Sequence, residues 1–151
     1  MADLILVLPN PHSGADEMKA PIKVKQKQSG FCYAACLQSL DNSSGGKYNQ
    51  DDSGIDQTTG WVRVNSSRVR WRAVKSAYDE LKSTLDAGSY CLVYITGKYR
   101  HWVVAYAADA PVADKIYVMD PYRGEYITLR RAMQIHSAYT LTEVRRVVIS
   151  K

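Results

Sequence analysis

The chain reads QKQSGFCYAACL from Gln26 to Leu37, and this stretch decides how the rest of the sequence is interpreted. Gly30 interrupts the extended run before it, and the alanine- and leucine-containing residues after Cys32 favour a helix. Cys32 should therefore lie in the first turn of that helix, where unpaired backbone N–H groups and the helix dipole favour a thiolate over a thiol. Because the Gln26 carboxamide lies six residues upstream, the stretch predicts a nucleophile with a hydrogen-bond donor nearby.

A base and an orienting group follow in one later region. His101–Tyr106 and Ile116–Asp120 are rich in β-branched and aromatic residues, and a polar segment joins them. These features predict two adjacent antiparallel strands. His101 at the start of one strand and Asp120 at the end of the other should then lie side by side, so that a neutral imidazole can take the proton from Cys32 while the carboxylate fixes its tautomer.

In order and spacing, these motifs resemble the papain-like fold. The resemblance is to the bacteriocin-processing (double-glycine) peptidases and to free-standing papain-like bacterial toxins and effectors, and it covers about residues 22–130. It implies a cysteine peptidase in which Cys32 is the nucleophile and Gln26 supplies the oxyanion-hole side chain. It also makes His101 the base and Asp120 the orienting residue. No metal and no cofactor is implied.

The resemblance implies a protein substrate, and a Gly-Gly motif in it, because the processing peptidases accept double-glycine sequences in a narrow cleft. Tyr33, Trp102 and Tyr122 are the aromatic residues expected to wall such a cleft. The chain departs from the family at the nucleophile, since the processing peptidases usually carry Asp-Cys-Gly where this sequence has Phe-Cys-Tyr at 31–33. This departure concerns substrate preference more than the chemistry.

Two alternatives stay open at this point. A papain-like acyltransferase or glutamine deamidase would keep the thioester intermediate and release it to a different acceptor. A non-catalytic binding module for an acidic partner would keep only the fold. The toxin and effector relatives further imply a bound immunity protein, and delivery into a target cell by a specialised secretion system.

The remaining cysteines and histidines have structural interpretations. Cys36 lies one helical turn beyond the proposed nucleophile and should pack beneath it, and Cys91 belongs to an apolar run that predicts core. His12 and His136 have no partner that the sequence identifies. Since the cysteines form no C-x-x-C pair and His101 and His136 have no second ligand at metal spacing, we expect no zinc site.

Composition and length are typical of one globular domain. The chain has 151 residues, is 46% hydrophobic and carries a formal charge of +5. Its three cysteines cannot all pair, and the apolar run at residues 4–8 is too short for a signal segment. We therefore expect a protein made in the bacterial cytoplasm. No apolar run approaches the roughly 20 residues of a membrane-spanning helix, so we expect no membrane partner and a free-standing peptidase unit.

The order of expected elements predicts an α+β fold, in which an N-terminal active-site helix packs against an antiparallel sheet across a cleft. Residues 1–21 should form an irregular arm with a short strand at 4–8, and 41–60 an exposed loop. Apolar residues at steps of three and four from Trp71 to Leu85 predict an amphipathic helix. Further strands are expected at 89–96, 102–107, 115–119, 126–127 and 144–149, with a helix at 129–136.

Basic residues gather between Trp61 and Lys75. Arg63, Arg68, Arg70 and Arg72 lie in this segment. Our first interpretation is that they form the solvated face of the amphipathic helix. As a binding surface they would suit an acidic protein better than nucleic acid, so we expect no nucleic-acid function.

Overall fold

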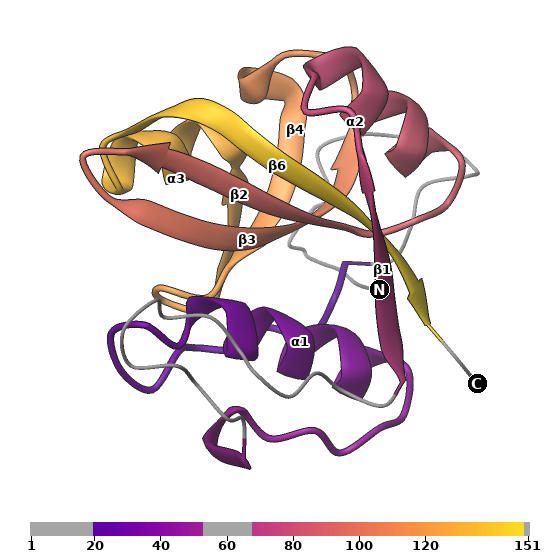
Figure 1. Cartoon of the computed structure of the whole chain (residues 1–151), viewed down its shortest axis with the longest axis vertical. Coiled ribbons are helices and arrows are strands. Elements are labelled where there is room, and N and C mark those ends of the chain that lie inside the picture. The colour runs from indigo at the N-terminus through magenta and orange to yellow at the C-terminus, as the bar shows by residue number, and fades with distance from the viewer. Residues whose placement is uncertain (1–19, 53–67, 150–151) are drawn as a thin grey trace, which may run out of the picture.

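The computed structural model describes residues 20–52 and 68–149. Within these residues the protein is α+β, with a six-stranded antiparallel sheet in the order β1-β6-β2-β3-β4-β5 and three α-helices (Figure 1). The strands are β1 (Val69–Val74), β2 (Cys91–Gly97), β3 (Arg100–Ala108), β4 (Ile116–Asp120), β5 (Glu125–Thr128) and β6 (Ala138–Ile149). The helices are α1 (Cys32–Ser43), α2 (Tyr78–Asp86) and α3 (Leu129–Ile135), with short 3-10 turns at Gln50–Asp52 and Ala113–Lys115.

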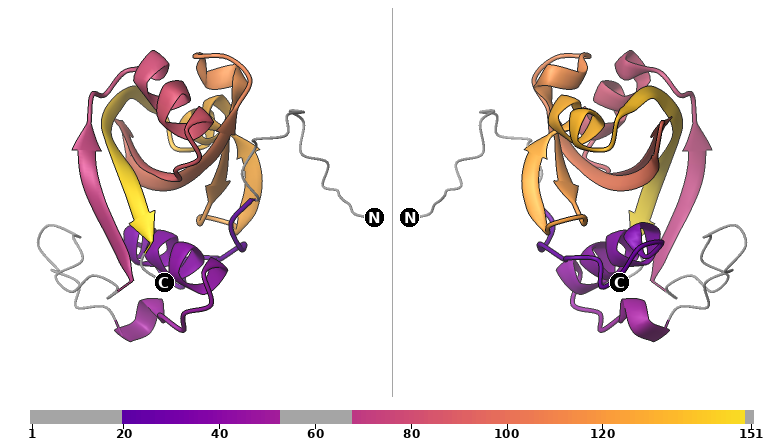
Figure 2. Two further views of the ribbon diagram at one scale, coloured as in Figure 1. Left: turned by 90° about the vertical axis from the view of Figure 1, so that its right-hand side faces the viewer. Right: turned by 90° about the vertical axis from the view of Figure 1, so that its left-hand side faces the viewer.

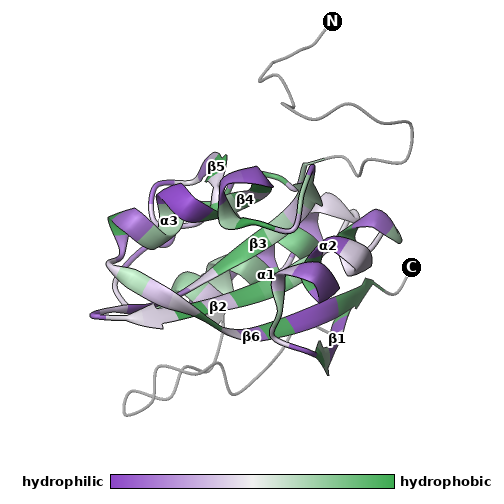
Figure 3. Ribbon diagram, turned by 90° about the horizontal axis from the view of Figure 1, so that it is seen from above, coloured by the Kyte–Doolittle hydropathy of each residue, from purple (hydrophilic) through white to green (hydrophobic). Residues whose placement is uncertain are grey.

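Helices cover both faces of the sheet, with α1 on one face and α2 and α3 on the other (Figures 1 and 2). Side chains of the central strands alternate between the two sides, as the pleat of a strand requires. Val93 and Val103 pack toward α2 and α3, whereas Leu92 and Val104 pack toward α1. Because both faces are buried, β2 and β3 are hydrophobic along most of their length, which Figure 3 shows as green ribbon.

Several expectations of element type and order are confirmed. The α+β class, the antiparallel sheet and the helix that begins at Cys32 are all present, and β3 and β4 are antiparallel neighbours. The expected strands at 126–127 and 144–149 are longer in the structure, as β5 and β6. The papain-like arrangement is a finer statement than this architecture and belongs to the proposal below.

The prediction of an amphipathic helix that begins near Trp71 was wrong for the first half of that segment. Trp71 and Val74 lie on β1, which pairs along its whole length with β6, and helix α2 begins only at Tyr78. The steps of three and four across this region fit a helix by chance, because backbone pairing with the distant β6 overrides local periodicity. Arg70 and Arg72 are therefore exposed residues of an edge strand and not the wet face of a helix.

The segment predicted as a long exposed loop at 41–60 is also more ordered than expected. Helix α1 continues to Ser43, and Gln50 is almost fully buried in a 3-10 turn. Residues 53–60 lie outside the described part of the chain, as do the expected arm at 1–19, its strand at 4–8, His12, Trp61 and Arg63.

Candidate functional site

Cys32 is the first residue of α1. The turn before it closes through a hydrogen bond from the Phe31 N–H to the Gln28 carbonyl at 3.2 Å. Gly30 has φ +88°, a backbone conformation that side-chain-bearing residues rarely adopt. This turn starts the helix at the cysteine, whose side chain is partly exposed and makes no disulfide. The thiol therefore lies at the N-terminal end of the helix, as the sequence predicted.

His101 and Asp120 come from neighbouring strands and are in direct contact. His101 is the second residue of β3 and Asp120 is the last residue of β4. Their Nε2 and Oδ1 atoms are 2.6 Å apart, and both side chains are buried. The hairpin geometry inferred from the sequence thus places the two groups within hydrogen-bonding distance.

The other side of the His101 ring faces Cys32. Burial acts to lower the pKa of His101, but hydrogen bonds with Asp120 and Cys32, together with their negative charges, outweigh it and raise the pKa to about 9. Since Nε2 is taken by Asp120, Nδ1 is the ring nitrogen left for the thiol.

Asp120 has a second histidine partner that the sequence did not reveal. The Nε2 atom of His136 lies 3.0 Å from Oδ2, and the Tyr122 N–H donates to Oδ1 at 2.8 Å. Burial acts to raise the pKa of Asp120, but the hydrogen bonds from His101 and His136 hold it well below its usual range. The expectation that His136 has no identifiable partner was therefore wrong. His136 follows α3, and no local pattern in the sequence indicates where that helix docks.

Gln26 is fixed in place by backbone contacts to both sides of the site. Its N–H donates to the Pro121 carbonyl at 2.6 Å, directly after Asp120. The buried carboxamide of Gln50 accepts from the Lys27 N–H at 2.9 Å and donates to the Lys25 carbonyl at 3.0 Å. Nothing in the sequence points to Gln50, because a glutamine in a polar segment carries no signal of burial.

The Gln26 side chain is only partly satisfied. Its Nε2 atom donates to the Gln28 carbonyl at 3.3 Å, and its buried Oε1 has no hydrogen-bond partner among the described residues. A carboxamide nitrogen has two N–H groups, so one remains after this bond. The Gln26 carboxamide therefore keeps one N–H that this bond does not use.

The three aromatic residues expected to wall a substrate cleft differ in exposure. Tyr33 and Trp102 are 2% and 3% exposed, pack edge to face with ring centroids 4.8 Å apart, and surround the Arg145 guanidinium. Both rings are therefore buried and do not face solvent. Tyr122 is 44% exposed and touches His136 edge-on at 5.1 Å, so it is the member of this set that a substrate can reach.

The other two cysteines are packed, as expected. Cys36 is fully buried, and its Sγ lies 3.6 Å from the Trp102 carbonyl. Burial raises the pKa of Cys36 well above the usual value, and it raises the pKa of Cys91 to about 12. Both thiols therefore stay protonated and unreactive near neutral pH.

The expectation that His101 and His136 have no further ligand at metal spacing was also wrong. One ligand atom each from His101, Asp120 and His136 lies within 4.8 Å of the others, and two imidazoles with one carboxylate form a donor set that suits zinc or a related ion. In this structure those same atoms are hydrogen-bonded to one another. A metal would have to displace both hydrogen bonds, so the geometry fits a proton-sharing cluster better than a preformed metal site.

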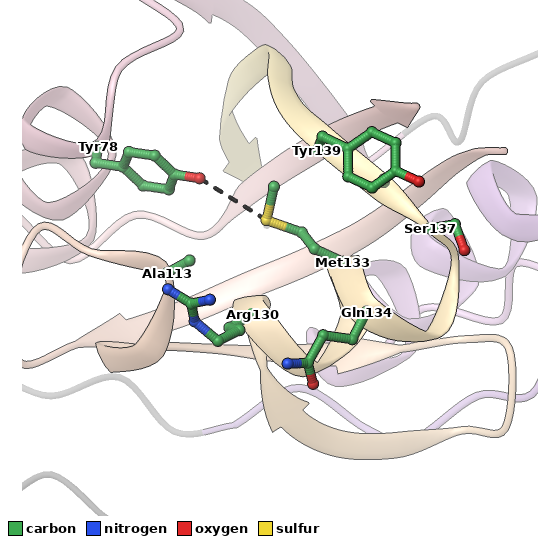
Figure 4. Close-up of a pocket in the computed structure, with 8 residues that line it drawn as sticks. Tyr78, Ala113, Arg130, Met133, Gln134, Ser137 and Tyr139 are labelled. Carbon is green, nitrogen blue, oxygen red and sulfur yellow. Dashed lines mark hydrogen bonds between the residues drawn. The ribbon is translucent and has the colours of Figure 1, made fainter. Parts of the chain in front are cut away.

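A separate pocket of about 480 Å³ lies beside α3. Figure 4 shows its lining from α2, α3 and the start of β6, with the Tyr78 hydroxyl 3.8 Å from the Met133 sulfur. None of the residues that line it belongs to the cysteine–histidine–aspartate site.

The chain matches no protein-family model and no curated protein among those with which it was compared. Within residues 20–52 and 68–149, no helix has the length and apolar character needed to cross a membrane. The function therefore has to be argued from the site itself.

Proposed function

We propose that the protein is a papain-like cysteine peptidase, with Cys32, His101 and Asp120 as the catalytic triad. The observation that carries this proposal is the position of the His101 ring, which hydrogen-bonds Asp120 through Nε2 at 2.6 Å and lies near enough to Cys32 for the thiol to contribute to its raised pKa. A nucleophile, a base and an orienting carboxylate in series are the general arrangement of covalent acyl-transfer catalysis.

The electrostatics favour a protonated His101 ring. Because the Asp120 carboxylate stays ionised and raises the pKa of His101, the imidazole can hold the Cys32 proton near neutral pH. The sulfur then attacks a peptide carbonyl, forming a C–S bond while the carbonyl electrons move onto oxygen. His101 donates its proton to the leaving amine as the C–N bond breaks.

The developing oxyanion needs donors that are in place before the reaction. Two are available, the backbone N–H of Cys32 at the start of α1 and the second N–H of the Gln26 carboxamide. Water then attacks the thioester with His101 as base, the C–S bond breaks, and the acid product leaves with the thiol restored. Gln50 supports this step by holding the backbone on both sides of Gln26.

The proposed substrate is a peptide bond within a protein chain. Tyr122 is exposed, lies two residues after Asp120 and packs on His136, so it is the side chain we place against the bound peptide. A preference for Gly-Gly rests on the family resemblance alone. Substrates with and without that motif are therefore both included in the test.

The test is peptide cleavage by the purified protein, read by mass spectrometry on a peptide library with and without Gly-Gly sequences. We expect Cys32→Ala and His101→Ala to lose all turnover while the fold, measured by circular dichroism, is kept. Cys91→Ala, a matched cysteine variant in the opposite core, should retain activity. Cleavage by Cys32→Ala would refute the proposal, and products that show a one-dalton change or a new amide bond would favour deamidation or acyl transfer.

A further inference from the structure

We propose that His136 is a positioning residue of this site, which locks the Asp120 carboxylate and the His101 ring in their working orientation. This inference rests on the proposed function. It adds a second histidine, from a separate part of the fold, to the triad.

The first observation is that His136 completes the set of donors around the carboxylate. Oδ1 of Asp120 accepts from His101 and from the Tyr122 N–H, and Oδ2 accepts from His136 at 3.0 Å. With donors on both oxygens, the carboxylate cannot rotate without breaking at least one buried hydrogen bond. The orientation of the group that orients His101 is therefore itself fixed.

The second observation is a direct contact between the two imidazoles. The rings of His101 and His136 are stacked, with centroids 3.6 Å apart and an interplanar angle of 26°. Tyr122 closes the outer side of His136 edge-on at 84°. His136 therefore covers one face of the His101 ring and restricts its rotation, while its own ring is held by Tyr122.

The third observation is the backbone conformation around His136, which directs its side chain toward Asp120. His136 ends α3, with its N–H bonded to the Ala132 carbonyl at 3.1 Å. Ser137 then has φ +47°, a left-handed conformation that is costly for a residue other than glycine. This turn also packs against Gly97 at the end of β2. A Cβ atom at position 97 would lie 2.4 Å from the Ser137 carbonyl oxygen, so a larger residue there would clash with the turn.

The same contacts predict that His136 affects the pKa of His101. The groups that face its ring are Cys32 from α1, Asp120 from β4 and His136 from the turn after α3, with the Tyr122 N–H on the carboxylate. Whether His136 is neutral or protonated, its Nε2–H draws negative charge from the carboxylate. Removing that donor leaves more of the charge for His101, so the pKa of His101 should rise in either case.

The experiment measures alkylation of Cys32 by iodoacetamide as a function of pH, which requires no substrate. In the wild-type protein Cys32 should already react below an alkaline inflection, which marks the loss of the proton from the His101 imidazolium. His101→Ala should lose the reactivity below this inflection and show a single inflection from the unpaired thiol. His136→Phe keeps a ring and loses the donor, so its inflection should move upward by about one pH unit. His136→Gln keeps a donor near the position of Nε2 and should shift less, and Gln134→Ala, an exposed change on the same helix, should not shift.

The outcomes separate this inference from the proposed function. If the pH dependence of Cys32 alkylation is the same in His101→Ala as in the wild-type protein, the proposed function is refuted. A wild-type profile that depends on His101, but is unchanged in His136→Phe, would leave the triad standing and overturn the role of His136. A purely structural role would lower the yield of folded protein without moving the inflection, because its position does not depend on the amount of active protein.

A second measurement covers the case in which the variants do not fold. Long-range proton–nitrogen spectra of the histidine-labelled wild-type protein report which ring nitrogen carries the proton. We expect Nε2 of His136 to be protonated across the pH range in which the protein is folded, because Oδ2 of Asp120 needs that donor. A neutral His136 with its proton on Nδ1 and a bare Nε2 would overturn the inference.

Discussion

Replacement of Asp120 by alanine tests the central cluster most directly, because this one side chain contacts both histidines. It is 1% exposed and accepts three hydrogen bonds, from His101, from His136 and from the Tyr122 N–H. The alanine variant would leave all three donors buried without an acceptor. We therefore expect a large loss in the free energy of unfolding, in addition to any loss of catalysis.

The magnitude follows from the number and kind of contacts. Each buried donor left unpaired costs about 1–3 kcal/mol, and breaking a buried charge pair by removing one partner costs about 3–5 kcal/mol. The three contacts share one carboxylate and their costs are not additive. We expect Asp120→Ala to lose about 3–5 kcal/mol and Asp120→Asn to lose less, because the carboxamide oxygen can still accept from one imidazole.

The assay is urea unfolding at pH 6, in a Cys32→Ala background so that no peptidase activity disturbs the measurement. Asp109→Ala is the matched control, since Asp109 lies on the same hairpin and accepts one hydrogen bond from the Tyr117 hydroxyl at 2.9 Å near the surface. The control should lose less than about 1 kcal/mol. If Asp120→Ala is destabilised no more than Asp109→Ala, the cluster does not hold the fold in the way described here.

Three further predictions concern charge, the oxyanion and backbone packing. Because the pKa of His101 is raised to about 9, the stability that its charged form contributes should be complete below about pH 6.5 and should be lost as the pH rises through about 9. The lowered pKa of Asp120 contributes stability that is present above about pH 4 and is lost in acid. Both effects can be measured as the free energy of unfolding across pH. Gln26→Ala should lower kcat by about 10²–10³-fold with the fold intact, whereas Gln28→Ala, an exposed glutamine that offers only its carbonyl, should not. Gly97→Ala should destabilise by about 1–3 kcal/mol in urea unfolding, because the new Cβ would meet backbone of the turn before β6.

The parts of the site that lie close together in sequence could be predicted. His101 and Asp120 belong to one hairpin, so recognising two adjacent strands was enough to place them together. The start of α1 at Cys32 follows from a glycine turn and a helix-favouring run. In both cases the interactions that decide the geometry are local, and local interactions are what a single sequence reveals.

The parts that could not be predicted depend on long-range packing. Trp71 was assigned to a helix because its strand partner, β6, lies more than 70 residues later in the chain. Gln50 is buried because it bridges α1 and the segment that carries Gln26. Arg145 is buried against Tyr33 and Trp102, which removes those rings from the surface on which a substrate would bind. Each of these placements is decided by a partner that the local sequence does not name.

The position of Asp120 also explains why one carboxylate can serve two layers of the fold. The sheet separates α1 from α3, and their apolar cores do not mix. Asp120 ends β4 at the edge of both layers, so His101 connects it to the thiol of α1 while His136 reaches it from the end of α3. The end of α3 is therefore connected to the His101 ring by two hydrogen bonds and a stacked ring pair.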